Sequence, residues 1–215
     1  MSYSTPAGTK FYVTSTFAAV KTATNVTNAN PAVVTSTSHG YTDGDIVLVN
    51  SGWEEITDML VKVDQTDSNT FSLLGVNTVN TDLHVADGGD TSTFALASAW
   101  IEIPQVLTIN PSGGDMKTVA VNPLGRRNGF VLPDGFNPVT IGMTIGHDVS
   151  LANWDTLLNL SRTQTLVGYK SVKPNGAVTY AYGYFIMSEV VKQTTGQADF
   201  VDASFFAQGR TISYA

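Results

Sequence analysis

The chain has 215 residues, of which 42% are hydrophobic and only 13% are charged, and its formal net charge is −7. It contains no cysteine, which excludes disulfides and metal sites built on thiolates. No apolar run is long enough to cross a membrane as a helix. The low charge, together with many Thr, Val, Gly, Asn and aromatic residues, predicts a mainly β protein.

The negative charge is concentrated in one stretch of the chain. Residues 25–90 contain ten carboxylates and one basic residue, Lys62, so this stretch carries −9 and the remainder carries +2. The carboxylates are Asp43, Asp45, Glu54, Glu55, Asp58, Asp64, Asp67, Asp82, Asp87 and Asp90. Such an asymmetry predicts two separately folded units.

The first part of the chain predicts short strands. Residues 1–10 are small and polar and predict a mobile arm, and the apolar alternation of Lys10–Ser15 then predicts a strand. Within residues 24–83, four short apolar runs alternate with turn clusters, which predicts a small barrel or sandwich. The four runs are Pro31–Ser38, Asp45–Asn50, Met59–Val63 and Thr70–Leu74.

The middle of the chain contains a long stretch with little periodicity. Phe94–Trp100 and Ile101–Ile109 are predicted strands, and Pro104 makes part of the second an edge strand or a bulge. Asn110–Asn137 then contains Gly-Gly, Asn-Pro, Asn-Gly and Pro-Asp-Gly, with Val119–Val121 as its one clear strand. We predict a long loop, which in a compact domain is usually functional or disordered.

The one convincing helix begins near residue 150. Asp148 or Ser150 is the predicted N-cap, because a short side-chain oxygen accepts a free backbone N–H at that position. Leu151, Trp154 and Leu158 follow at spacings of three and four, so they share one face of the helix. Leu157 and Leu160 widen this apolar stripe.

A hairpin follows the helix directly. Thr165–Val172 and Ala177–Val191 flank a turn at Pro174-Asn175-Gly176, where Asn-Gly suits positive φ angles. In the second strand, Tyr180, Tyr182 and Tyr184 alternate with smaller or apolar residues and define one face. Further strands are predicted at Pro138–Ile145 and Gln197–Gln208. A single helix beside long strands predicts a helix packed on a sheet or partly closed barrel.

The sequence lacks a pattern for catalysis or metal binding. His39, His84 and His147 lie in turns or at element ends without metal-ligand spacing, and we predict surface or capping roles. Thr42–Asp45 and Asp87–Asp90 resemble fragments of calcium loops, but both lack the twelfth-position Glu, so turns are the better interpretation. We expect no enzymatic activity, no catalytic residue, no cofactor and no metal.

Two resemblances add to this interpretation. Asn30–Thr35, His39-Gly40, Gly44–Val47 and Asn69–Leu73 resemble a small β-barrel module that is inserted in many phage structural proteins and is akin to a domain of ubiquitin-activating enzymes. The order of the other elements is similar to the tail tube proteins of phages with long non-contractile tails. This second resemblance covers Lys10–Ser15 and about residues 100–214.

The tail tube resemblance implies a fold and a domain order. Residues 1–23 and 93–215 would form a tail-tube β-sandwich or partly closed barrel with one flanking α-helix. The insert at residues 24–92 departs from the better-known members of that family, and its charge, not the resemblance, leads us to predict an inserted small β-barrel module on the outer surface, where solvent and salt screen the carboxylates.

The resemblance also implies a function. The chain would be a structural virion protein of a siphophage, forming hexameric rings that stack into a conduit for DNA ejection. Its partners would be itself, the tape measure protein, tail-end proteins and DNA that passes through without specific binding, with no membrane contact. It would lie in the virion tail and, during assembly, in the host cytoplasm. A carbohydrate-binding or adhesion β-module of a virion or cell surface is the alternative.

We further predict that residues 110–137 mediate ring stacking. Their apolar side chains have little to pack against in a monomer, so ordering this loop would need a neighbouring subunit. The only double arginine, Arg126-Arg127, could contact DNA phosphate, but a solvated loop tip or a salt bridge to another subunit fits an acidic chain better. The predicted stacking residues are Met116, Val119, Val121, Leu124, Arg126, Arg127, Phe130 and Leu132.

Overall fold

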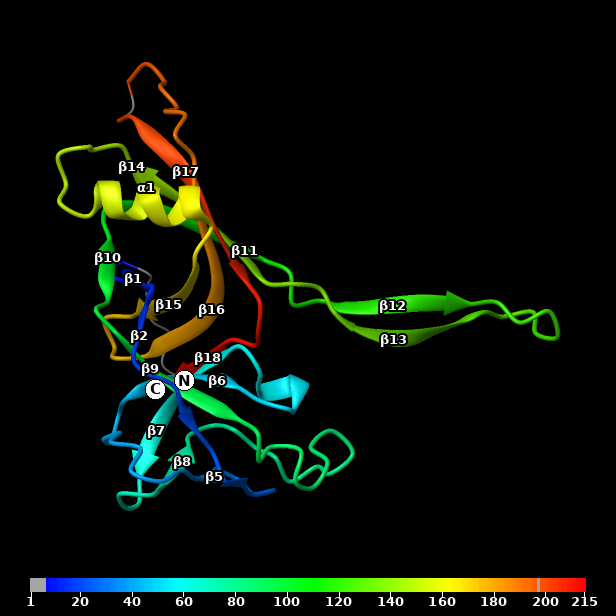
Figure 1. The fold of residues 1–215 in the computed structure, drawn as a ribbon. Helices are drawn as coiled ribbons and strands as arrows, with labels where there is room; N and C mark the ends of the chain where they lie inside the picture. Colours follow the sequence, from blue (N-terminus) through cyan, green and yellow to red (C-terminus); the bar gives the residue numbers. More distant parts are fainter. Residues whose placement is uncertain (1–6, 197) are drawn as a thin grey trace.

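The computed structural model describes residues 7–196 and 198–215, and this part of the chain is mainly β with one α-helix, as predicted (Figure 1). A mobile arm is expected for residues 1–10, and residues 1–6 of it lie outside the described part of the chain. Gln197, at the start of the last predicted strand, also lies outside it. Within the described ranges, no helix is long and apolar enough to cross a membrane.

The first sheet has eight antiparallel strands in the order β10-β1-β15-β16-β17-β14-β11, and β18 pairs with β16. Their bounds are β1 (Lys10–Thr14), β10 (Ile101–Ile103), β11 (Val106–Ser112), β14 (Thr140–Gly146), β15 (Leu166–Val172), β16 (Val178–Met187), β17 (Phe200–Ala207) and β18 (Ile212–Tyr214). The predicted edge strand at Pro104 is confirmed, because β10 ends at the residue before Pro104 and lies at one edge of the sheet.

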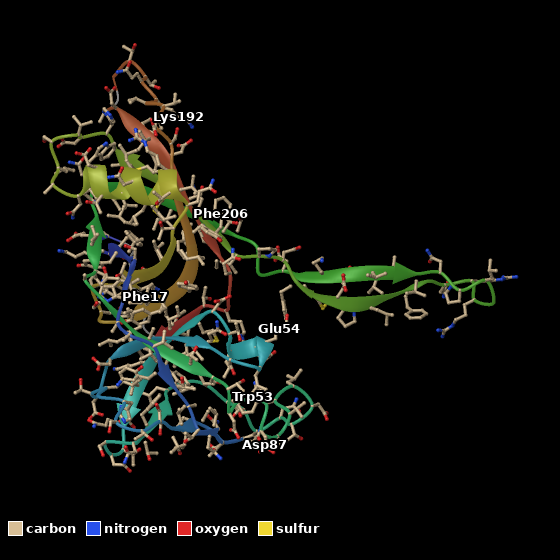
Figure 2. The ribbon with its side chains drawn as sticks, in the orientation of Figure 1. Phe17, Trp53, Glu54, Asp87, Lys192 and Phe206 are labelled. Atoms are coloured by element: carbon tan, nitrogen blue, oxygen red, sulfur yellow. The ribbon has the colours of Figure 1, made fainter. Side chains whose placement is uncertain are left out.

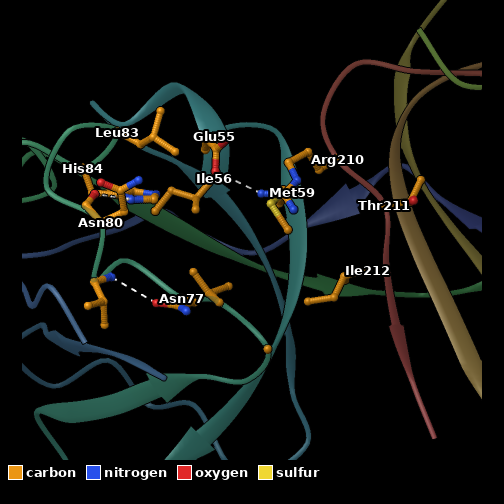
Figure 3. Close-up of a pocket in the computed structure, with 13 residues that line it drawn as sticks. Glu55, Ile56, Met59, Asn77, Asn80, Leu83, His84, Arg210, Thr211 and Ile212 are labelled. Carbon is orange, nitrogen blue, oxygen red and sulfur yellow. Dashed lines mark hydrogen bonds and ion pairs between the residues drawn. The ribbon is translucent and has the colours of Figure 1, made fainter. Parts of the chain in front are cut away.

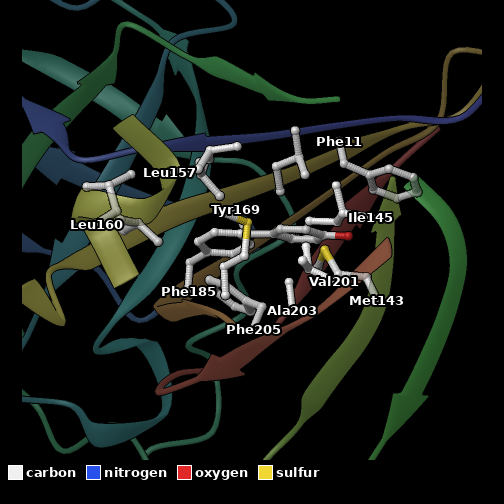
Figure 4. Packing of buried hydrophobic residues seen from close by; sticks show 14 of the residues in the cluster. Phe11, Met143, Ile145, Leu157, Leu160, Tyr169, Phe185, Val201, Ala203 and Phe205 are labelled. Carbon is white, nitrogen blue, oxygen red and sulfur yellow. The ribbon is translucent and has the colours of Figure 1, made fainter. Parts of the chain in front are cut away.

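The helix α1 (Trp154–Thr163) covers one face of this sheet (Figures 1 and 4). It begins later than predicted, at the N-cap Asn153, and no side chain caps it. The Asp148 carboxylate instead accepts hydrogen bonds from the backbone N–H of Ser150 at 3.0 Å and from its hydroxyl at 2.6 Å. Both predicted caps are therefore used in a turn before the helix.

The core of the first sheet lies between α1 and the inner strand faces (Figure 4). The helix contributes Trp154, Leu157 and Leu160, all members of the predicted apolar stripe, while its other members, Leu151 and Leu158, are only partly buried. Phe185 of β16 and Phe205 of β17 are opposite each other in the register and fully buried.

The second sheet also has eight strands, in the order β2-β9-β6-β7-β8-β5-β4, with β3 paired to β9. The bounds are β2 (Thr16–Phe17), β3 (Lys21–Thr22), β4 (Asn25–Val26), β5 (Ala32–Thr35), β6 (Ile46–Asn50), β7 (Met59–Gln65), β8 (Thr70–Leu73) and β9 (Thr93–Ser98), with a 3-10 turn η1 (Glu54–Ile56). The four predicted strands of this region are present as β5 to β8, around a separate apolar core. Since β2, β3 and β9 lie outside residues 24–92, the second sheet extends beyond that range. The predicted division into a tail tube domain and an inserted module of residues 24–92 stays a prediction.

Two histidines of the second sheet are buried, contrary to the surface positions expected for them. His39 Nε2 donates to the Asp67 carbonyl at 2.9 Å and its Nδ1 accepts from the Tyr41 N–H at 3.0 Å. His84 Nδ1 donates to the Asn80 carbonyl at 3.1 Å. Backbone groups of the surrounding turns therefore satisfy both ring nitrogens of His39 and Nδ1 of His84, whereas His84 Nε2 has no partner in the described chain.

A third apolar cluster joins the two sheets. Tyr180 and Tyr182, on the face of β16 opposite Phe185, pack with Ile46, Leu60 and neighbours on the second sheet. Figure 2 labels Phe17, which packs against this cluster where the two sheets meet. Because both sheets contribute buried side chains, the junction is a packed interface rather than a flexible link.

The strand β18 reinforces this junction. It pairs with β16 of the first sheet, while the Tyr214 hydroxyl accepts from the Lys62 N–H and donates to the Leu74 carbonyl, both at 2.9 Å. One short strand thus hydrogen-bonds to both sheets.

Candidate assembly interface

Residues 116–136 form a hairpin that projects from the body (Figure 1). It consists of β12 (Met116–Val121) and β13 (Phe130–Phe136), which pair with each other and with no other strand of the described chain. The prediction of a long loop at Asn110–Asn137 is therefore wrong, because the segment is mostly strand.

One face of the hairpin is an apolar stripe. In the antiparallel register, Val119 is opposite Leu132 and Val121 is opposite Phe130. Successive pairs alternate between faces, so these four side chains share one face, which we call the stripe. Val119 and Leu132 are each 49% exposed and Phe130 is 40% exposed. The opposite face has Ala120 paired with Val131, and Thr118 paired with Pro133.

The base of the hairpin is held by backbone geometry. Gly113 and Gly114 have φ angles of +84° and +78°, and a Cβ at Gly113 would lie 1.9 Å from the Pro138 carbonyl oxygen. Gly114 N–H donates to the Asn137 carbonyl at 3.0 Å, and Asn137 N–H donates to the Asp115 carbonyl at 2.9 Å. The glycine pair thus allows a sharp turn that aims the hairpin away from the first sheet.

The tip of the hairpin carries two positive charges and a solvent-exposed leucine. Leu124 is fully exposed, and the Arg126 guanidinium lies over the Phe130 ring, 5.7 Å from its centroid. Arg126 and Arg127 form no ion pair within the described chain, whereas Lys117 pairs with Asp134 at 3.6 Å along the stem. The tip arginines are therefore available to a carboxylate outside this subunit.

The structure distributes the predicted stacking residues over the whole hairpin. Four of them form the stripe, Met116 lies at the base, and Leu124 with the two arginines occupies the tip. The sequence analysis missed Phe136, which is paired with Met116 and is 75% exposed. The alternation of side chains along Phe130–Phe136 indicates a strand that includes Phe136, but Pro133 and Gly135 interrupt this pattern in the sequence.

These features are those of a protein-binding element. A two-stranded hairpin by itself is marginally stable in water, and contiguous exposed apolar side chains mark interaction surfaces. Both outer edges of the hairpin also lack strand partners within the described residues. No group of three or more His, Asp or Glu residues in the described ranges could hold a metal ion.

Comparison with known proteins agrees with this geometry. A family model for the phage tail tube protein, TTP, matches residues 51–215, about three quarters of the chain. No curated protein matches the chain. The match covers the hairpin, α1 and the strands from β7 onward. The chain therefore belongs to the phage tail tube protein family, a family of structural proteins of the virion tail that assemble into a tube and are not enzymes.

Proposed function

We propose that this chain builds the tail tube of a siphophage as hexameric rings, which stack into a conduit for DNA ejection. The projecting hairpin contacts a subunit of the neighbouring ring and holds the two rings together. The observation that carries this proposal is the stripe, because four apolar side chains share one face on which Val119, Leu132 and Phe130 are 40–49% exposed.

The length of the hairpin and the positive charge of its tip support the same role in holding neighbouring rings together. From Met116 to Leu124 the hairpin can extend about 26 Å, at roughly 3.3 Å per residue, so the tip can reach an adjacent subunit. The tip arginines can then meet carboxylates of the acidic neighbour, where partial desolvation strengthens the pairing. A contact between different surfaces of identical subunits propagates without limit, as a tube requires.

The segment 24–92 is proposed to be a small β-barrel module on the outside of the tube, similar to that of ubiquitin-activating enzymes. With −9 charges per copy, six modules in a narrow bore would repel one another and the DNA. On the outer surface, salt screens the same charges. The other proposed partners are the tape measure protein, tail-end proteins and passing DNA, with assembly in the host cytoplasm.

The experiment compares the two faces of the hairpin. A stripe variant, Val119→Thr with Leu132→Thr, keeps strand-favouring side chains but makes the contact face polar. We expect purified protein to stay folded and to lose tubes in negative-stain images, since each buried Val or Leu contributes about 1.5–3 kcal/mol to a contact. Val131→Thr on the opposite face is the matched control and should still form tubes.

Two results would contradict the proposal. Tubes of normal length and yield from the stripe variant would exclude the stripe as the stacking contact. Equal loss of tubes in the Val131→Thr control would mean that the substitutions act on hairpin stability instead. Six-fold symmetry is tested separately, by class averages of end-on views.

A further inference from the structure

A pocket of about 430 Å³ lies beside the second sheet, on the side where the chain returns through residues 210–212 (Figure 3). Its walls come from three segments, residues 55–59, 75–84 and 210–212. Volumes of roughly 300–1,000 Å³ are typical of small-molecule sites. The hairpin and the stripe contribute no residue to it.

The charges on the pocket wall cancel. The Glu55 carboxylate and the Arg210 guanidinium pair with each other at 3.1 Å. Both groups lie at the exposed rim, and the pocket lining contains no other Asp, Glu, Lys or Arg. A charged ligand would have to compete with this pair, so the wall favours a neutral ligand.

Two asparagines present hydrogen-bond donors to the pocket. Asn77 Oδ1 accepts from the Val79 N–H and Asn80 Oδ1 accepts from the Asp82 N–H, both at 3.0 Å. These turns orient each amide and leave its NH₂ group without a partner in the described chain. The free donors suit a ligand with several oxygen acceptors.

His84 adds an acceptor without a donor. Since its Nδ1 donates to the Asn80 carbonyl, Nε2 is the acceptor nitrogen of the neutral ring. Nε2 is the one buried side-chain polar atom of the described chain that has no hydrogen-bond partner. A buried polar atom without a hydrogen-bond partner needs an explanation. Since His84 lines the pocket, a ligand hydroxyl that reaches the ring would supply the missing donor.

The inner wall is apolar. Val79 and Leu83 line the pocket and are exposed, and the nearly buried Ile56, Met59 and Val76 lie beneath them. A bound molecule must therefore combine an apolar face with a rim of hydroxyl groups and have no charge. We propose that this pocket binds a neutral sugar ring, with its C–H face on the apolar wall and its hydroxyls toward the asparagine amides and His84.

The test uses the full chain and methyl glycosides of glucose, galactose, mannose and N-acetylglucosamine as probes. We expect at least one to bind with a Kd of about 1–10 mM. In NMR titrations of the wild type, the shifted backbone amides should map to residues 75–84 and 210–212. Absence of binding by all four probes, or shifts confined to other regions, would overturn the proposal.

An isosteric variant tests the donors. Asn77→Asp with Asn80→Asp keeps each oxygen that accepts the turn hydrogen bond and removes each NH₂ group. Affinity should fall about tenfold or more with an unchanged melting temperature. Asn175→Asp is the matched control, because Asn175 Oδ1 accepts from the Ala177 N–H at 3.1 Å in a turn outside the pocket.

Affinity in the double variant equal to that of the wild type would refute the role of the amides. An equal loss in the control would show a general effect of added charge and refute it too. The variant should still form tubes, so failure here is distinguishable from failure of the proposed tube function.

Discussion

The Tyr214 hydroxyl group stabilises the junction between the two sheets. Replacing Tyr214 with Phe keeps the ring in its apolar cluster and removes the hydroxyl that bonds Lys62 N–H and the Leu74 carbonyl at 2.9 Å. Each backbone group left unpaired and partly buried costs about 1–3 kcal/mol. Solvent can reach part of the site, so we expect a total loss of about 2 kcal/mol.

The assay is thermal unfolding of the soluble subunit. A loss of about 2 kcal/mol corresponds to a fall in Tm of roughly 4–8 °C for a chain of this size. The matched control is Tyr184→Phe, because the Tyr184 hydroxyl makes no hydrogen bond to the described residues. Equal Tm shifts in the two variants would refute the role assigned to the Tyr214 hydroxyl.

A pH series gives a second readout of the same group. Burial chiefly raises the pKa of Tyr214 to about 12, above the ordinary value of 10.0. The folded state therefore favours the neutral phenol, and the contribution of this group to stability is complete below pH 10 and is lost as pH rises toward 12. The stability difference between wild type and Tyr214→Phe should shrink over that interval. A difference that grows with pH would contradict the assignment.

Two further predictions concern the core and the hairpin. Phe205→Ala should reduce the free energy of unfolding, measured by urea titration, by about 3–5 kcal/mol. The reason is that Phe205 is fully buried and its ring centroid lies 5.0 Å from that of Tyr169. A loss below about 1 kcal/mol would mean that the core collapses around the cavity. Trypsin should cleave quickly after Arg126 or Arg127 in the free subunit and slowly in assembled tubes, because these residues occupy the exposed tip; equal rates would argue against burial of the tip.

The sequence predicts those elements whose period is visible along the chain. The strands β5 to β8 and the hairpin of β15 and β16 were found because apolar residues alternate and glycine-rich turns separate them. The helix was found, but its first residue was misplaced, since Asp148 and Ser150 hydrogen-bond to each other instead of capping it. A capping side chain and a turn-forming side chain have the same sequence signature.

The hairpin was missed for a different reason. Both faces of β12 and β13 are exposed, so no core imposes a regular pattern, and Pro133 with Gly135 breaks the alternation that remains. The apolar composition nevertheless selected the same residues as an interaction site. Their arrangement into one stripe depends on the register of Val119 with Leu132, which only the paired strands reveal.

The strand β16 shows how one alternation serves two contacts. Ala181, Phe185 and Met187 face α1 and the first core, while Tyr180 and Tyr182 face the second sheet. The alternation in the sequence separates the two faces but does not show which surface the tyrosine face contacts. Larger amphipathic rings suit the second face, because the junction is less completely enclosed and a phenol tolerates partial contact with water. Gly168 of the neighbouring β15 allows this close approach, since a Cβ there would lie 2.9 Å from Leu60 Cδ1. The second sheet is therefore packed against the same strand that contributes Phe185 to the core of the first sheet.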